Sequence, residues 1–241
     1  MSIAIIIPAR YASTRLPGKP LIEIGGKPII QWVYEKSLAS TLAKKVIVAT
    51  DDEKILNAVE AFGGEAVMTS EHHKSGSDRI FEVLTKYPEI EIAVNVQGDE
   101  PLITPESIDA AINTLISDYK ADISTLIRKL DSEEEFNNPN VVKVVFDNEQ
   151  NALYFSRSPI PFRRNAGQAD NYAHIGLYVY KREALEKMTK LPQSPLELTE
   201  SLEQLRALQN GMKIKTAVVN YKPIGIDTPE DVEEFKKLLN L

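Results

Sequence analysis

The sequence predicts an α/β fold built on a mainly parallel central sheet that is flanked by helices. Short apolar runs rich in β-branched residues, such as 3–7 and 45–50, are typical of strands buried on both faces. These runs alternate along the chain with longer helical segments, a pattern that indicates parallel strands joined by crossover helices. The chain has no internal repeat, low-complexity tract or linker, so we expect one domain over residues 1–241.

The composition is that of a globular protein, and it excludes several classes of function. The chain is 43% hydrophobic and 26% charged, which is ordinary for a soluble domain. A formal net charge of -7 argues against nonspecific nucleic-acid binding. The absence of cysteine excludes disulfides, thiolate metal sites and thiol nucleophiles. We find no signal peptide and no apolar run of membrane-spanning length, so we expect a cytoplasmic protein without a membrane partner.

The first strand leads into a basic loop over residues 8–20. Pro8 ends the strand, because proline has no N–H to offer a sheet ladder. The loop carries Arg10, Arg15 and Lys19, with no acidic residue before Glu23. Such cations repel one another unless an anion lies among them, and ligands of open α/β sheets bind beyond the carboxyl ends of strands. We therefore favour a cradle for a polyphosphate over a solvated loop.

The basic loop matches neither of two common phosphate-binding motifs. Pro20 stands where a P-loop needs a hydroxyl residue, and position 13 is Ser instead of Gly. The chain also lacks G-x-G-x-x-G. A kinase-type or dinucleotide-type phosphate site is therefore disfavoured.

The segments between residues 28 and 89 predict further alternation. We expect helices over 28–39 and after Asp51 and Asp52, and strands over 45–50 and 65–68. Aspartate is a good helix N-cap, which makes a capping role for this pair more probable than a metal role. His72 and His73 form a pair in a polar loop without a third ligand, so we favour solvation over metal binding.

Arg79 lies in the first turn of the next predicted helix, which we expect Ser77 and Asp78 to cap. A cation is poorly placed at a helix N-terminus, because the helix dipole is positive there. This placement indicates a partner anion or carbonyl for Arg79.

The strand over 90–96 places Gln97, Gly98 and Asp99 at its carboxyl end. In a parallel sheet this end shares an edge with the basic loop. A carboxylate beside a polyphosphate acts chiefly through a magnesium ion, which prefers oxygen ligands. On this placement alone a metal role for Asp99 and a turn or capping role both stay open.

The second half of the chain adds a predicted hairpin, an arm and a helical region. Strands at 141–146 and 152–156 flank a polar loop, as in a β-hairpin. Two prolines then break the sheet in a segment that extends to residue 171, and we expect another subunit to cover this arm. Strand 174–180 is followed by helix 182–190. One helical run over 197–208 would bury Leu198, Leu202, Leu205 and Leu208.

The last strand, 214–219, precedes Asp227 and a terminal helix. Asp227 can cap that helix or hold a metal, and the two roles are compatible.

Motifs spread over nearly the whole chain are similar to those of the CMP-KDO synthetases, the 3-deoxy-manno-octulosonate cytidylyltransferases. The motifs lie at residues 8–20 (P-A-R-Y-x-S-T-R-L-P-G-K-P), 75–79, 96–101 (V-Q-G-D-E-P), 156–161, 174–178 (H-I-G-L-Y), 200–206 and 225–231 (G-I-D-T-P-E-D). The resemblance implies a single Rossmann-like nucleotidyltransferase domain. It also implies that residues of about 140–180 form a hairpin and arm for sugar binding and homodimer contacts.

The resemblance further implies transfer of CMP from CTP to the acidic eight-carbon sugar KDO, giving CMP-KDO and pyrophosphate for lipopolysaccharide biosynthesis. The implied catalytic residues are Arg10, Lys19, Asp99 and Asp227. The implied nucleotide contacts are Pro8, Ala9, Arg10, Ser13, Arg15, Lys19, Arg79 and Gln97. The implied sugar contacts are Arg157, His174, Tyr178, Glu203 and Gln204. Asp99 and Asp227 are the implied ligands of the cofactor, Mg²⁺.

Other functions stay open on the sequence. A related cytidylyltransferase for sialic acid or an 8-amino sugar differs in the substrate alone. Sugar-1-phosphate enzymes typically open with G-G-x-G-T-R, which is absent here. A non-catalytic nucleotide-sensing dimer has no need of two metal carboxylates, so Asp99 and Asp227 together disfavour it.

Overall fold

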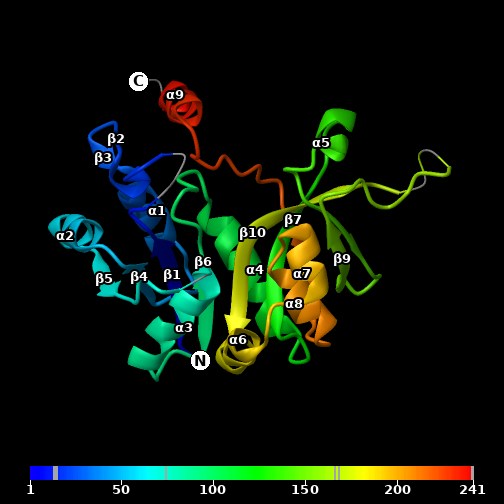
Figure 1. Cartoon of the computed structure of the whole chain (residues 1–241), viewed down its shortest axis with the longest axis horizontal. Helices are drawn as coiled ribbons and strands as arrows, with labels where there is room; N and C mark the ends of the chain where they lie inside the picture. The colour runs from blue at the N-terminus through cyan, green and yellow to red at the C-terminus, as the bar shows by residue number, and fades with distance from the viewer. Residues whose placement is uncertain (13–15, 74, 166, 168, 240–241) are drawn as a thin grey trace. The chain divides into compact units, whose positions relative to one another are not determined.

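The computed structural model describes residues 1–12, 16–73, 75–165, 167 and 169–239 (Figure 1). The chain divides into two compact units. Unit 1 comprises Met1–Asp109 and Pro223–Leu241, and unit 2 comprises Ala110–Lys222. The expectation of one domain over 1–241 stays a prediction. No helix in the described part of the chain is long and apolar enough to cross a membrane.

Unit 1 contains parallel strands in the order β6, β1, β4, β5 (Figure 1). Their bounds are Ile3–Ala9 for β1, Lys45–Thr50 for β4, Glu65–Met68 for β5 and Ile92–Asn95 for β6. Ile5, Ile6 and Ile7 are fully buried, because helices cover both faces of these strands. The predicted α/β fold with a mainly parallel sheet is confirmed.

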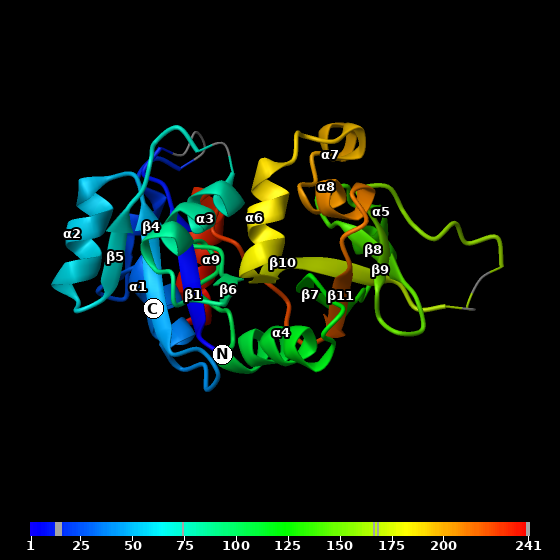
Figure 2. The same ribbon diagram turned by 90° about the horizontal axis from the view of Figure 1, so that it is seen from below.

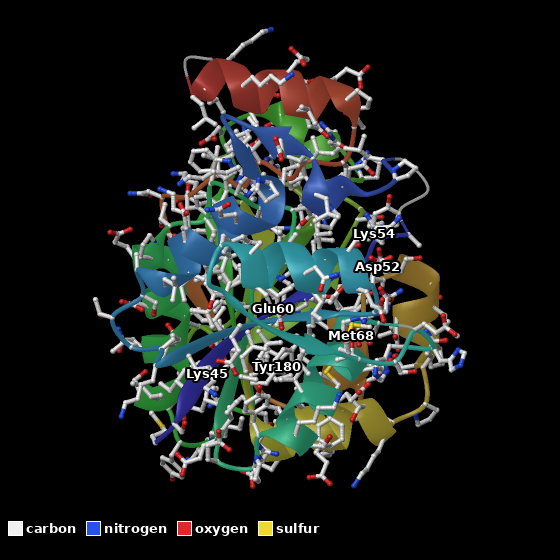
Figure 3. The ribbon with its side chains drawn as sticks, turned by 90° about the vertical axis from the view of Figure 1, so that its left-hand side faces the viewer. Lys45, Asp52, Lys54, Glu60, Met68 and Tyr180 are labelled. Atoms are coloured by element: carbon white, nitrogen blue, oxygen red, sulfur yellow. The ribbon has the colours of Figure 1, made fainter. Side chains whose placement is uncertain are left out.

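The helices of unit 1 follow the right-handed crossover rule. Helix α1 (Ile29–Leu38) joins β1 to β4, and α2 (Glu53–Ala61) joins β4 to β5, so both cover one face. Figure 3 views the α2 side, with Asp52 and Lys54 at one end of the helix. Helix α3 (Gly76–Lys86) leads back across β4 and β1 to β6 and covers the opposite face. The winding direction therefore reverses between β1 and β6, where ligands of such sheets bind.

The C-terminal segment packs against the chain that follows β1. A 3₁₀ turn (η1, Lys19–Leu21) and a small hairpin of β2 (Glu23–Ile24) and β3 (Lys27–Pro28) precede α1. Helix α9 (Pro229–Leu238) contributes Val232 and Phe235 to an apolar cluster with Ile24, Ile29 and Ile226. This cluster holds the segment before α9 close to Lys19.

Unit 2 contains the central strands β11 (Ile214–Val218), β7 (Ile123–Lys129) and β10 (Tyr172–Lys181). Strand β7 runs parallel to β11 and antiparallel to β10. Strands β8 (Lys143–Phe146) and β9 (Ala152–Ser156) form the predicted hairpin, and β8 pairs with the start of β10. Helix α4 (Pro105–Ser117) lies on one side of β7 and β10 in Figure 2, and α6 (Arg182–Lys190) and α8 (Gln204–Gln209) lie on the other. Helices α5 (Glu133–Asn137) and α7 (Pro195–Glu200) complete the unit.

The prediction of one helix over 197–208 was wrong. The chain forms α7 and α8 instead, because Ser201 adopts a left-handed conformation with φ 53° that ends α7. Leu198, which we expected on the buried face, is 60% exposed, whereas Leu205 is fully buried. The predicted cap at residues 77–78 is also wrong, since Ser75 caps α3 by accepting from the backbone N–H of Asp78.

Candidate active site

A pocket of about 410 Å³ in unit 1 lies at the reversal point between β1 and β6. Its lining residues are Pro8, Ala9, Arg10, Ala12, Lys19, Pro20, Gln97, Gly98, Asp99 and Asp227. The structure therefore brings together the predicted basic loop, the end of β6 and the segment before α9. The predicted residues Ser13 and Arg15 lie outside the described part of the chain.

Lys19 lies between the two carboxylates of the pocket. Its Nζ donates to Asp99 Oδ2 at 2.6 Å and to Asp227 Oδ1 at 3.0 Å. Burial alone would lower the pKa of Lys19, but attraction and hydrogen bonds to both carboxylates outweigh it and raise the pKa. The ammonium group is therefore charged at neutral pH, and the three groups together carry one net negative charge.

Backbone contacts fix the position of both carboxylates. A Cβ built on Gly98 would lie 2.9 Å from the carbonyl oxygen of Pro8, so only glycine permits this approach of the two strand ends. The N–H of Ile226 donates to the Asp99 carbonyl at 2.9 Å and ties the third segment to them. Asp227 does not cap α9; Thr228 does, by accepting from the N–H of Asp231. The Asp227 carboxylate is thus directed to Lys19.

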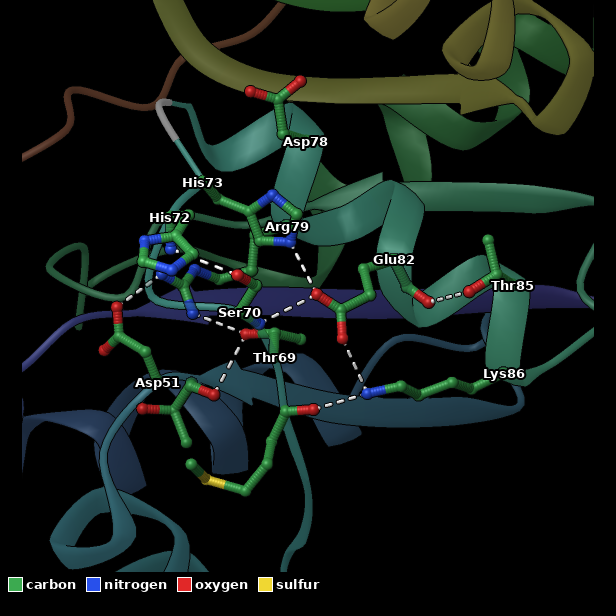
Figure 4. Close-up of polar contacts among 12 residues, drawn as sticks. Asp51, Thr69, Ser70, His72, His73, Asp78, Arg79, Glu82, Thr85 and Lys86 are labelled. Carbon is green, nitrogen blue, oxygen red and sulfur yellow. Dashed lines mark hydrogen bonds and ion pairs between the residues drawn. The ribbon is translucent and has the colours of Figure 1, made fainter.

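Arg10, an exposed residue of the pocket, donates from Nη2 to the carbonyl oxygen of His73 at 2.7 Å. His73 in turn places Nε2 2.6 Å from Glu82 Oε2 (Figure 4). Burial raises the pKa of Glu82, but hydrogen bonds from Lys86, Ser70 and His73 overcome it and lower the pKa to about 2. The loop before α3 is thereby held where its backbone reaches Arg10.

Arg79 has the anionic partner that its place in α3 predicts. Its Nη2 donates to Asp51 Oδ2 at 2.6 Å and its Nη1 donates to Thr69 Oγ1 at 2.5 Å (Figure 4). The side chain is 0% exposed. Asp52 alone caps α2, by accepting from the N–H of Lys54 at 2.7 Å, so the capping prediction is wrong for Asp51. The Arg79 guanidinium therefore links the ends of β4 and β5 to the first turn of α3.

A second polar cluster lies in unit 2 along β10. The His174 ring packs against Phe155 and Tyr178 with centroid distances of 5.1 and 5.2 Å, and Nε2 lies 3.0 Å from Thr125 Oγ1. Burial lowers the pKa of His174 to about 3 and raises the pKa of Tyr178 well above its ordinary value. Both side chains are therefore neutral at pH 7. The contact between their rings places both side chains on the same face of β10.

Gln204 starts helix α8 and is 5% exposed. Its Nε2 is a buried donor that has no hydrogen-bond acceptor among the described residues. Its neighbour Glu203 lies 3.7 Å from the guanidinium of Arg206. A buried amide without a partner is costly, so this donor points to a ligand.

Arg157 is engaged by the protein itself. Its Nε donates to the Glu200 carbonyl at 2.8 Å, and its Nη1 donates to the Pro139 carbonyl at 3.1 Å. Its predicted contact with a sugar stays a prediction.

Comparison with known proteins identifies the family. Residues 4–214 match a family model described as cytidylyltransferase. The 3-deoxy-manno-octulosonate cytidylyltransferase of Thermodesulfovibrio yellowstonii is 52% identical over 98% of this chain and 97% of that protein. The chain belongs to the 3-deoxy-manno-octulosonate cytidylyltransferase family. The member from Geobacter metallireducens is 48% identical over 100% of this chain and 98% of its own length.

Solved structures agree with membership of this cytidylyltransferase family. The structure of CMP:2-keto-3-deoxy-manno-octonic acid synthetase complexed with CTP aligns with a TM-score of 0.96 and 45% identity, over 100% of this chain and 99% of that chain. A cytidylyltransferase from Leptospira borgpetersenii, at a TM-score of 0.68 and 20% identity, covers 100% of this chain and 87% of that chain and shares the fold.

The donor set in the pocket of this cytidylyltransferase fits a magnesium ion that shares its coordination with substrate. Mg²⁺ typically binds one or two carboxylates plus phosphate oxygens and water. Asp99 and Asp227 converge on one cation, Lys19, and leave one net negative charge for another. Among the described residues no group of three or more His, Asp or Glu side chains could hold a metal ion. Phosphate oxygens and water would therefore have to complete the coordination.

Sequence reasoning missed several buried polar contacts of this cytidylyltransferase. Asp51 and Thr69 hold Arg79, and Lys143 is a fully buried lysine in β8. The only sequence signal for Lys143 is its position inside the apolar run Val-Val-Lys-Val-Val. The buried pair of Glu197 and Arg206, at 2.5 Å, could not be found from spacing alone.

Proposed function

We propose that the chain transfers CMP from CTP to 3-deoxy-D-manno-octulosonate and releases pyrophosphate. The arrangement of Asp99, Lys19 and Asp227 in the pocket of unit 1 carries this proposal. It supplies a fixed cation for a triphosphate and two carboxylates for a metal, on a chain that belongs to this family.

The reaction is a displacement at the α-phosphorus of CTP. The anomeric oxygen of the sugar forms a bond to this phosphorus, and the bond to the oxygen bridging to the β-phosphate breaks. The hydroxyl proton passes to solvent, and the electron pair leaves with pyrophosphate. Such transfers depend on positioning and on neutralising charge, with little covalent work for the protein.

The residues of unit 1 neutralise the triphosphate and the leaving group. Arg10 is exposed at the pocket and exchanges the His73 carbonyl for phosphate oxygens. Lys19 is held charged by its neighbours, and a fixed cation stabilises the charge that develops on pyrophosphate. Pro8, Ala9 and Gln97 line the same pocket as nucleotide contacts.

Asp99 and Asp227 would hold Mg²⁺. When bound, the ion polarises the α-phosphate and lowers the pKa of the attacking hydroxyl. Both carboxylates would hold the ion, and the hydrogen bonds from Lys19 keep the two carboxylates next to each other.

Unit 2 supplies neutral hydrogen-bonding groups for the hydroxyls of the sugar. Neutral His174 and protonated Tyr178 offer both donors and acceptors, and the unpaired amide of Gln204 is a further donor. Glu203 is the acidic acceptor of this group. A sugar that fills the site relieves the buried donor of Gln204, and this relief favours binding.

We also propose a cytoplasmic homodimer that uses the arm between β9 and β10. Phe162 in this arm is 89% exposed beside Arg163, which packs 3.7 Å from the centroid of the Phe136 ring. Aromatic residues are enriched at protein interfaces relative to the rest of the surface. Analytical ultracentrifugation compares the mass of wild type with that of Phe162→Ser. We expect a dimer for wild type and a larger share of monomer for the variant, and a monomeric wild type would contradict the dimer.

The test of the function is pyrophosphate release with CTP, Mg²⁺ and a panel of acid sugars, with EDTA as control. We expect release with the octulosonate and loss of release with EDTA. Release with another acid sugar alone would keep the reaction and change the substrate. CTP binding without release for any sugar would indicate a nucleotide sensor.

A further inference from the structure

We propose that Lys143, Arg157 and Glu200 form a brace that positions the start of α8 for sugar binding. In this proposal Arg157 is a positioning residue that acts through its contacts with the end of α7. The inference rests on the proposed function, because Gln204 is the sugar contact through which the brace acts.

Lys143 is the buried centre of the brace. Its side chain has no exposed surface, and its Nζ donates to the carbonyls of Asn138, Val141 and Arg157 at 2.9, 2.6 and 2.5 Å. An ammonium group has three donors, so every donor is used. Burial and the nearby Arg157 lower the pKa of Lys143, because both disfavour the charged ammonium group.

Arg157 carries the connection from the hairpin to α7. Its backbone carbonyl accepts from Lys143, and its Nε donates to the carbonyl of Glu200 at 2.8 Å. Its Nη2 lies 3.5 Å from the carbonyl of Ser201. The guanidinium therefore holds the carbonyl groups at the C-terminus of α7, where a cation also complements the helix dipole.

Glu200 closes the brace from the other side. Its carboxylate accepts from Ser156 Oγ at 2.6 Å and from the N–H of Arg157 at 2.9 Å. Burial raises the pKa of Glu200, but the bonds from Ser156, Arg157 and Tyr154 outweigh it and lower the pKa, so the carboxylate is charged. Side chain and backbone of Glu200 are thus both fixed to β9.

The turn that the brace holds sets the position of Gln204. Ser201 follows Glu200 with φ 53°, a conformation that persists in a non-glycine residue only where its surroundings determine it. Helices α7 and α8 are only six residues each, too short to be stable on their own. Without the brace the turn relaxes, and the buried Nε2 of Gln204 moves from the place it holds for the sugar.

The test compares substrate constants of Lys143→Met and Arg157→Lys with wild type in the pyrophosphate assay. We expect KM for the sugar to rise about 10- to 100-fold, the range for a misplaced positioning contact. KM for CTP stays within about twofold, because the nucleotide pocket lies in unit 1.

A control variant separates positioning from general destabilisation. Arg128→Met breaks a largely buried ion pair at 2.8 Å between Arg128 of β7 and Glu135 of α5, in the same unit. It should lower Tm and leave KM for the sugar unchanged. An equal rise in sugar KM in Arg128→Met, or an equal rise in KM for CTP in the brace variants, would overturn the proposal.

A double-mutant cycle with Gln204→Ala identifies the route of the effect. If the brace acts through Gln204, Lys143→Met and Arg157→Lys add less than about twofold to sugar KM in the Gln204→Ala background. A full additional rise from Arg157→Lys would mean direct contact with the sugar and overturn its positioning role. If Lys143→Met does not fold, Ser156→Ala takes its place, since it removes one bond to Glu200.

The two proposals fail in different ways. Absence of release by wild type with every acid sugar contradicts the proposed function and the brace together. An active wild type whose brace variants behave like Arg128→Met contradicts the brace alone.

Discussion

Lys19 and Lys143 are both lysines surrounded by oxygen atoms, but the two environments differ in charge and access. Lys19 lines an open pocket and binds two carboxylates, which raise its pKa. Lys143 is fully buried and binds three carbonyls, and its pKa is lowered. The first cluster keeps a net negative charge beside solvent, and the second uses every donor internally.

From this difference we expect Lys19 to take part in ligand binding and Lys143 to stabilise the local structure. Under the proposed function, a metal and phosphate would offer new charged partners to Asp99, Asp227 and Lys19. Lys143 donates to three backbone carbonyls, so its removal takes one donor from each of them. We therefore expect substitutions in the Lys19 cluster to reduce kcat, and substitution of Lys143 to displace the residues around it.

The largest effect is expected from Asp99→Asn. Removing a metal carboxylate should reduce kcat about 1,000- to 10,000-fold, while Tm and the circular dichroism spectrum stay close to wild type. Asp118→Asn is the matched control, because Asp118 pairs with Lys213 at 3.0 Å and Lys215 at 3.4 Å in unit 2. An Asp99→Asn variant that retains kcat and raises only KM for the sugar would contradict a role of the Lys19 cluster in the chemical step.

Arg79→Met tests whether Arg79, a third buried cation, stabilises the fold in the same way as Lys143. It leaves Asp51, 14% exposed, without its partner, which should cost about 3 kcal/mol of unfolding free energy. For a chain of this size that corresponds to a fall in Tm of roughly 6–12 °C in a thermal scan. Arg79→Lys should recover part of the loss. An unchanged Tm with weaker CTP binding would instead support a direct nucleotide contact for Arg79.

A pH-dependent effect concerns the acid stability of unit 2. The pKa of His174 is lowered from 6.5 to about 3 by burial, so the unfolded chain binds one more proton there between these pH values. This contribution to stability is present above pH 6.5 and is lost as pH falls toward 3, by at most about 1.4 kcal/mol per pH unit. Urea unfolding of His174→Gln should show a shallower pH slope than wild type. Parallel slopes would contradict the neutral, buried state of His174.

The sequence predicted the fold and the pocket edge because both depend on local patterns. Buried strands such as β1 and β4 are visible as β-branched runs, and parallel strands must bring their carboxyl ends to one edge. Arg10 and Asp99 could therefore be expected at one edge of a parallel sheet, whereas Asp227 was joined to them by the family motif alone. Their roles in catalysis stay predictions.

Residues whose partners are distant in sequence could not be assigned in this way. Asp51 and Asp52 are equivalent as helix caps, and only the contact with Arg79, 28 residues away, distinguishes them. The left-handed Ser201 lies in a segment with a strong helical pattern, so its interruption follows from tertiary contacts of Glu200. A buried lysine such as Lys143 contradicts the usual distribution of charge, and no periodicity reveals its carbonyl partners.

The missing side chain of Gly98 has a consequence for how this enzyme can change. A Cβ at this position would lie only 2.9 Å from the carbonyl oxygen of Pro8. Backbone atoms alone therefore set the distance between Asp99 and the basic loop. The distance between Asp99 and the basic loop is then insensitive to substitutions in the surrounding side chains. Under the proposed function, substitutions in unit 2 can change the preferred acceptor sugar while this backbone contact in unit 1 stays the same.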